Sequence, residues 1–137
     1  MTDLEKLTTL AWAVRRGFER FVNKAYGWID PDLGGYCYEA SARLFRLAKT
    51  HGLDVSLCKG RGHWFVMLDE KVIVDVTSTQ FSQPEKVAVL TQEEAEKRGD
   101  WWKLLEACVV PPYSICHGGE DEEIEKELIS VAETLNA

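Results

Sequence analysis

The chain has 137 residues, which is the size of one domain spanning residues 1–137. Its 23 acidic and 16 basic residues give a net charge of −7, which argues against duplex nucleic acid as a partner because phosphate contacts dominate such binding. No stretch is apolar enough to span a bilayer, so no membrane partner is expected. Residues 1–5 do not begin a signal peptide pattern, and a cytoplasmic protein is therefore expected.

The first half of the chain predicts two helices. Residues 3–25 carry apolar side chains at helical spacing along one face. The basic cluster on this segment is expected to be a solvated polar face. It consists of Arg15, Arg16, Arg20 and Lys24. A loop with Gly34 and Gly35 leads to Cys37, where a second helix starts and then ends at His51-Gly52.

Four short strands follow, at residues 54–58, 63–68, 72–76 and 86–90, with a turn at residues 69–71. Thr91 and Glu94 form a capping box that starts a third helix. Residues 101–110 are predicted to be helical as well, and residues 120–135 form a last helix whose acidic side chains face solvent. Consecutive strands flanked by helices predict an α+β fold, with the first two helices packed on an antiparallel sheet of three to five strands.

Cys37, His63 and Asp75 are the candidate catalytic residues. Folding the chain about Asp69 or Glu70 brings residue 63 opposite residue 75 to within about one residue, and facing Cβ atoms in an antiparallel pair lie about 5 Å apart. A thiol at a helix start is acidified by the helix dipole and the free N–H groups. Nucleophile, base and orienting carboxylate are the groups that acyl transfer requires.

A second donor is needed to stabilise an oxyanion beside the backbone N–H of Cys37. The sequence offers Tyr36, Trp64 and Gln80 as substrate-binding or oxyanion candidates, together with Trp28, and it does not choose among them. No cofactor is expected. No metal site is expected either, because Cys116 and His117 supply only two adjacent ligands.

The segments GGYCYEASARLF, GHWFV and VIVDVT resemble the catalytic core of the transglutaminase-like superfamily, a branch of the papain-like folds. The resemblance covers residues 34–81 and implies Cys37 as nucleophile, His63 as base and Asp75 as orienting residue. GGYCYE is also similar to the cysteine motif of arylamine N-acetyltransferases, but the Gly-Phe-Gly that follows the Asp in those enzymes is replaced here by Thr77-Ser78-Thr79-Gln80-Phe81.

The expected function is therefore hydrolysis, deamidation or transfer of an amide or thioester by a Cys-His-Asp triad. The partner would be a protein, a peptide or a small-molecule acyl donor. The alternative is a binding or host-interaction module that keeps the fold without turnover. The rate at which Cys37 is alkylated, relative to the other cysteines, discriminates between the two.

Overall fold

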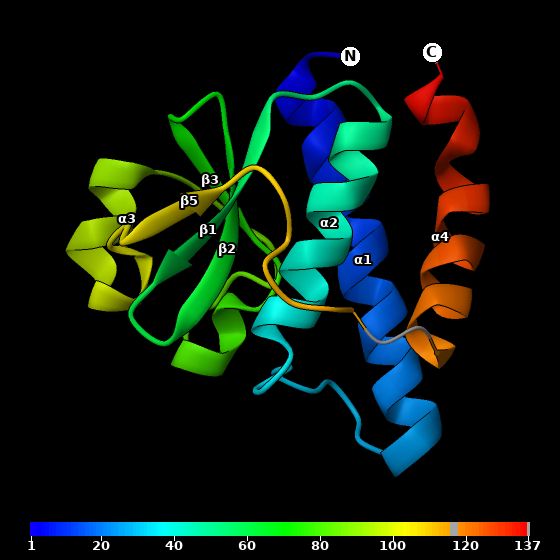
Figure 1. The fold of residues 1–137 in the computed structure, drawn as a ribbon. Helices are drawn as coiled ribbons and strands as arrows, with labels where there is room; N and C mark the ends of the chain where they lie inside the picture. Colours follow the sequence, from blue (N-terminus) through cyan, green and yellow to red (C-terminus); the bar gives the residue numbers. More distant parts are fainter. Residues whose placement is uncertain (116–117, 137) are drawn as a thin grey trace.

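The computed structural model describes residues 1–115 and 118–136, and Figure 1 traces its elements along the chain. Cys116 and His117, predicted to lie in a loop, fall outside the described residues. The helices are α1 (Asp3–Tyr26), α2 (Cys37–Thr50), α3 (Gln92–Arg98) and α4 (Gly119–Leu135), with short 3₁₀ helices η1 (Ser78–Phe81) and η2 (Asp100–Trp102). The strands are β1 (Val55–Gly60), β2 (His63–Leu68), β3 (Val72–Asp75), β4 (Ala88–Thr91) and β5 (Glu106–Cys108).

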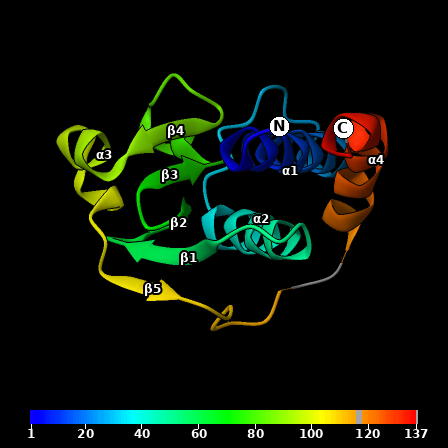
Figure 2. The same cartoon turned by 90° about the horizontal axis from the view of Figure 1, so that it is seen from above.

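The five strands form one antiparallel sheet in the order β4-β3-β2-β1-β5. This confirms the predicted α+β class. Seen from above, α1 and α2 cover one face of the sheet, α3 lies on the opposite side, and α4 packs on α1 away from the sheet (Figure 2). Strand β2 is central and buried along its whole length, because helices cover both of its faces.

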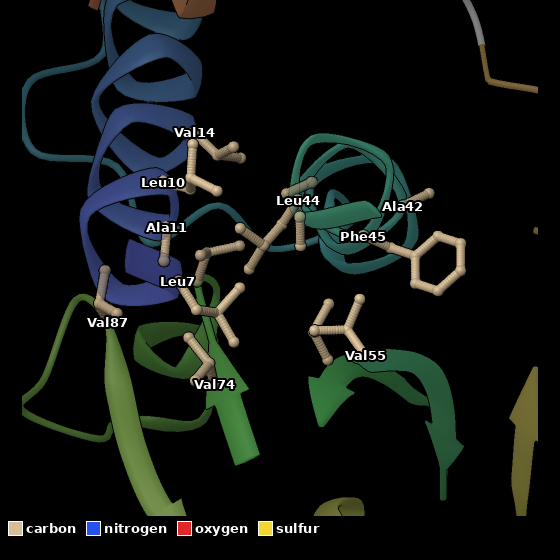
Figure 3. Close-up of a cluster of buried hydrophobic side chains, with 14 of the residues drawn as sticks. Leu7, Leu10, Ala11, Val14, Ala42, Leu44, Phe45, Val55, Val74 and Val87 are labelled. Atoms are coloured by element: carbon tan, nitrogen blue, oxygen red, sulfur yellow. The ribbon is translucent and has the colours of Figure 1, made fainter. Parts of the chain in front are cut away.

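The main core fills the space between α1, α2 and the sheet. Leu10 and Val14 of α1 point toward Leu44 of α2, and Val74 of β3 lies beneath them (Figure 3). A second cluster on the opposite face of the sheet contains Trp102 of η2 and residues of α3, β1, β2, β3 and β4. The sheet is thus fixed from both sides, which holds the ends of β2 and β3 in a defined position.

The segment 101–110 is not helical, contrary to the prediction. It forms the end of η2 and the edge strand β5, which pairs with β1 from Leu57↔Cys108 to Lys59↔Glu106. Its apolar residues suit either structure. Without β5, the backbone N–H and C=O groups along the outer edge of β1 would have no partners in the sheet. Strand β5 provides hydrogen bonds to them.

The acidic C-terminal helix and the basic cluster on α1 are paired with each other rather than being two separate solvated faces. Arg16 and Arg20 both bind Glu127, at 3.0 and 3.2 Å, and Lys24 binds Glu123. Both glutamates are nearly buried, with side chains 8% and 6% exposed. These contacts fix α4 against α1.

Candidate active site

His63 and Asp75 form a fully buried hydrogen-bonded pair at the start of β2 and the end of β3. Nε2 of His63 lies 2.6 Å from Oδ2 of Asp75, and neither side chain is exposed. The predicted proximity of these two residues is therefore present. A carboxylate bonded to one ring nitrogen fixes the orientation of the imidazole and directs the other nitrogen, Nδ1, away from the carboxylate.

His63 and Asp75 do not lie directly opposite each other in the pairing of β2 with β3. The ladder runs from Val66↔Val74 to Leu68↔Val72, which centres the turn on Glu70. Continued outward, this register sets Asp75 opposite residue 65, so His63 is its diagonal neighbour on the same face of the sheet. Diagonal positions on one face are within reach of long or aromatic side chains. The turn itself uses left-handed backbone at Asp69 and Glu70, with φ of 53° and 58°.

Asp75 accepts hydrogen bonds at both carboxylate oxygens. Oδ1 accepts from the backbone N–H of Thr77 at 2.9 Å and from its hydroxyl at 3.4 Å. Oδ2 accepts from the indole N–H of Trp102 at 2.7 Å in addition to His63. The Thr77 contact is an Asx-type turn that the Asp-Val-Thr sequence permits. No local sequence signal connects Trp102 to Asp75.

Cys37 is the first residue of α2 and is half-buried. The N-cap residue, Tyr36, makes no side-chain hydrogen bond to the amides of the first helical turn. Burial alone raises the pKa of the Cys37 thiol, but hydrogen bonds with His63 and with the backbone of Trp64 and Tyr38 outweigh it and lower that pKa below its ordinary value. The thiolate is thus favoured.

The pKa of the His63 imidazole is shifted upward, in contrast to that of the Cys37 thiol. Burial lowers its pKa, yet the charge and hydrogen bond of Asp75, together with the interaction with Cys37, raise the pKa of His63 to about 9. A lowered thiol pKa beside a raised imidazole pKa favours a proton on His63 and a negative charge on Cys37. In that charge state a sulfur has the electron pair that a nucleophile needs, and an imidazole has a proton to donate.

Gln80 of η1 lies at the second nitrogen of the ring. Its amide Nε2 is 3.3 Å from Nδ1 of His63 and donates to the hydroxyl of Thr77 at 3.0 Å. The same imidazole also acts on Cys37. The structure therefore brings Gln80 to the group around His63.

The other oxyanion candidates occupy different places. The Tyr36 ring packs edge-on against Phe18 of α1, with centroids 5.6 Å apart, so its side chain belongs to the α1–α2 interface. Trp28 is half-exposed and stacks on Tyr26. The ring of Trp64 is nearly buried, and this residue reaches the Cys37 sulfur through its backbone. Of the four candidates, Gln80 and the Trp64 backbone adjoin the triad.

Arg15 connects three segments around the site, contrary to its predicted place on a solvated face. Its side chain is 1% exposed and donates to the carbonyl of Val76 at 3.0 Å, to the hydroxyl of Thr79 at 2.9 Å and to the carbonyl of Pro31 at 2.8 Å. These acceptors lie after Asp75, before Gln80 and in the loop that leads to Cys37. Helix α1 thus supports a site to which it contributes no catalytic candidate.

Within residues 1–115 and 118–136, no group of three or more His, Cys, Asp or Glu side chains is arranged to hold a metal ion. In the same part of the chain, none of the helices has the length and apolar character needed to cross a membrane.

Comparison of the chain with family models, with curated proteins and with solved structures found no match in any of the three. The resemblance to the transglutaminase-like superfamily therefore remains a prediction that rests on the residues of this sequence.

Proposed function

We propose that the protein is a cysteine-dependent acyl-transfer enzyme acting on an amide or a thioester. The observation that carries this proposal is the relation of three residues: His63 is bonded to Asp75 at 2.6 Å, and the same imidazole lowers the pKa of Cys37 at the start of α2. The order of the three residues and their resemblance to transglutaminase-like cores support the same conclusion.

In the proposed reaction the Cys37 thiolate attacks the carbonyl carbon of the acyl donor and forms a tetrahedral oxyanion. The imidazolium of His63 then protonates the departing amine or thiol, the carbon–nitrogen or carbon–sulfur bond breaks, and a thioester on Cys37 remains. Water or an amine attacks this thioester while His63 accepts its proton, and the bond to Cys37 breaks. Asp75 keeps the ring oriented and stabilises its positive charge throughout.

Two features support stabilisation of the oxyanion. The first turn of α2 has no side-chain cap on its N–H groups, and the N–H of Cys37 is the proposed first donor. One N–H of the Gln80 amide donates to Thr77, and the other, which lies beside His63 Nδ1, is the proposed second donor. The acyl donor is expected to be a protein, a peptide or a small molecule. A cytoplasmic location forms part of the proposal, because a reducing compartment keeps Cys37 as a thiol.

The proposal is tested by alkylating the protein with iodoacetamide over a range of pH and mapping each labelled cysteine by mass spectrometry. Cys37 should label fastest at neutral pH. Burial raises the pKa of Cys58 to about 12 and is the main reason that the pKa of Cys108 is also raised, so these two thiols are internal controls that should label slowly.

The matched variant is His63→Ala. Its Cys37 should alkylate only at higher pH than in the wild type, since the imidazole that lowers the thiol pKa is gone, and catalysed turnover should fall by roughly 10² to 10⁴-fold. If Cys37 labels no faster than Cys108 in the wild type, or if His63→Ala leaves its pH profile unchanged, the acyl-transfer proposal fails. A non-catalytic binding module would then be favoured.

A further inference from the structure

We propose that Trp102 is a positioning residue of this site, and that its indole N–H fixes the Asp75 carboxylate in the orientation that holds His63. The catalytic meaning of this inference rests on the proposed function. The hydrogen bond between Trp102 and Asp75 can be tested separately.

One oxygen of the Asp75 carboxylate accepts hydrogen bonds from both His63 and Trp102. Oδ2 of Asp75 accepts from Nε2 of His63 at 2.6 Å and from Nε1 of Trp102 at 2.7 Å. Oδ1 is held by Thr77. A carboxylate with donors on both oxygens cannot rotate about its Cβ–Cγ bond without breaking at least one of them. Trp102 therefore restricts the plane in which Asp75 meets the imidazole.

Burial makes this hydrogen bond difficult to replace. The side chains of Trp102, Asp75 and His63 are all fully buried, so no solvent-exposed path lets bulk water take the place of the indole N–H. The ring itself is packed in the cluster on the far face of the sheet, which also contains Phe65 and Met67 of β2. If the indole donor were absent, Oδ2 would have one donor fewer in a dry environment.

The other ionisable groups that act on this pair come from different elements. Cys37 of α2 interacts with His63, and Arg15 of α1 interacts with Asp75 through its charge. Replacing Trp102 by phenylalanine changes neither group. The substitution removes one neutral hydrogen-bond donor and keeps an aromatic ring, so it isolates the contribution of the N–H.

The chain provides a matched control in the adjacent residue. Trp101 is half-buried, and its indole N–H has no hydrogen-bond partner among the described residues. Trp101→Phe makes the same chemical change as Trp102→Phe but breaks no hydrogen bond. In Trp102→Phe, we expect the pH midpoint of Cys37 alkylation to rise by about one pH unit, which corresponds to about tenfold slower labelling below that midpoint. Trp101→Phe should retain the wild-type midpoint.

Proton NMR gives a readout that does not depend on thiol reactivity. The proton shared by His63 and Asp75 should give a low-field resonance that persists in Trp101→Phe and is lost or shifted upfield in Trp102→Phe. In the wild type, which needs no substitution, the Trp102 indole N–H should exchange slowly and change its shift as His63 titrates.

The outcomes separate the two proposals. If Trp102→Phe lowers only the melting temperature, with the low-field proton and the alkylation profile intact, Trp102 is a packing residue and the inference is wrong. An indole resonance that does not respond to His63 titration overturns it as well, even where the variant fails to fold. If the NMR results hold while wild-type Cys37 is unreactive, Trp102 positions a pair that does not perform acyl transfer.

Discussion

Replacing Arg15 by methionine should destabilise the protein by about 3 kcal/mol. The substitution leaves an unbranched apolar chain in place but removes every donor of the guanidinium, which holds Val76, Thr79 and Pro31 at 2.8–3.0 Å. Each hydrogen bond to a charged group contributes about 1.5–3 kcal/mol. Part of this total is offset because burial of the guanidinium is itself unfavourable, as the lowered pKa of Arg15 indicates. The net cost is therefore close to that of removing one partner of a buried ion pair.

Urea denaturation at pH 7, followed by circular dichroism, measures this change. With an m-value of about 1.5 kcal/mol/M, the midpoint should fall by about 2 M. The matched control is Arg16→Met on the next position of α1, where the side chain is 40% exposed and bound to Glu127. It should cost less than about 1 kcal/mol. Equal midpoints for the two variants would refute the idea that Arg15 connects the segments around the site.

The remaining predictions concern pH and backbone packing. Because the pKa of His63 is raised from 6.5 to about 9, its contribution to stability, at most about 3 kcal/mol, is fully present below pH 6.5 and is lost as the pH rises through 9. The lowered pKa of Cys37 has the opposite effect, because the stability that the Cys37 thiolate contributes is lost as the pH falls through the pKa of this thiol in the folded protein. The free energy of unfolding should therefore decline more steeply between pH 6.5 and 8.5 in Cys37→Ala than in the wild type, and urea titrations showing the reverse order would contradict the thiolate–imidazolium pair. In Gly60→Ala, the new Cβ would lie 1.9 Å from the carbonyl oxygen of Trp101. This forces η2 to shift, so we expect a loss of about 1–3 kcal/mol in urea together with slower Cys37 alkylation; an unchanged variant would show that η2 can move without cost.

The sequence predicted those parts of the fold that are encoded locally. Apolar spacing located α1 and α2, the capping residues Thr91 and Glu94 located the start of α3, and the three-residue turn after Leu68 located the β2–β3 hairpin. The same hairpin brought His63 and Asp75 to one face. The register was displaced by two residues from direct pairing because the turn centres on Glu70, but a shift of two leaves each side chain on its original face.

Long-range contacts account for what the sequence did not predict. Trp102 reaches Asp75 only because β5 and η2 return to the sheet, and nothing near either residue signals that return. Arg15 is a charged residue among charged neighbours, and its burial depends on a loop and a 3₁₀ helix that meet it from distant parts of the chain. Because the acceptors that bind Arg15 lie on separate segments, no periodic pattern in the sequence indicates that this residue is buried.

The burial of Cys58 beneath the far face of the sheet makes this thiol an internal probe of structural opening. The residue lies on β1, between β2 and β5, and is completely buried. Its side chain lies in the cluster with Ala95 of α3 and Trp102 of η2, so its labelling rate reports the population of molecules in which this cluster has opened, as amide hydrogen exchange does. Cys37 is half-buried in the folded molecule and reports the native state. One time course with one reagent therefore yields both the reactivity of Cys37 and the free energy of opening of the cluster that contains Trp102.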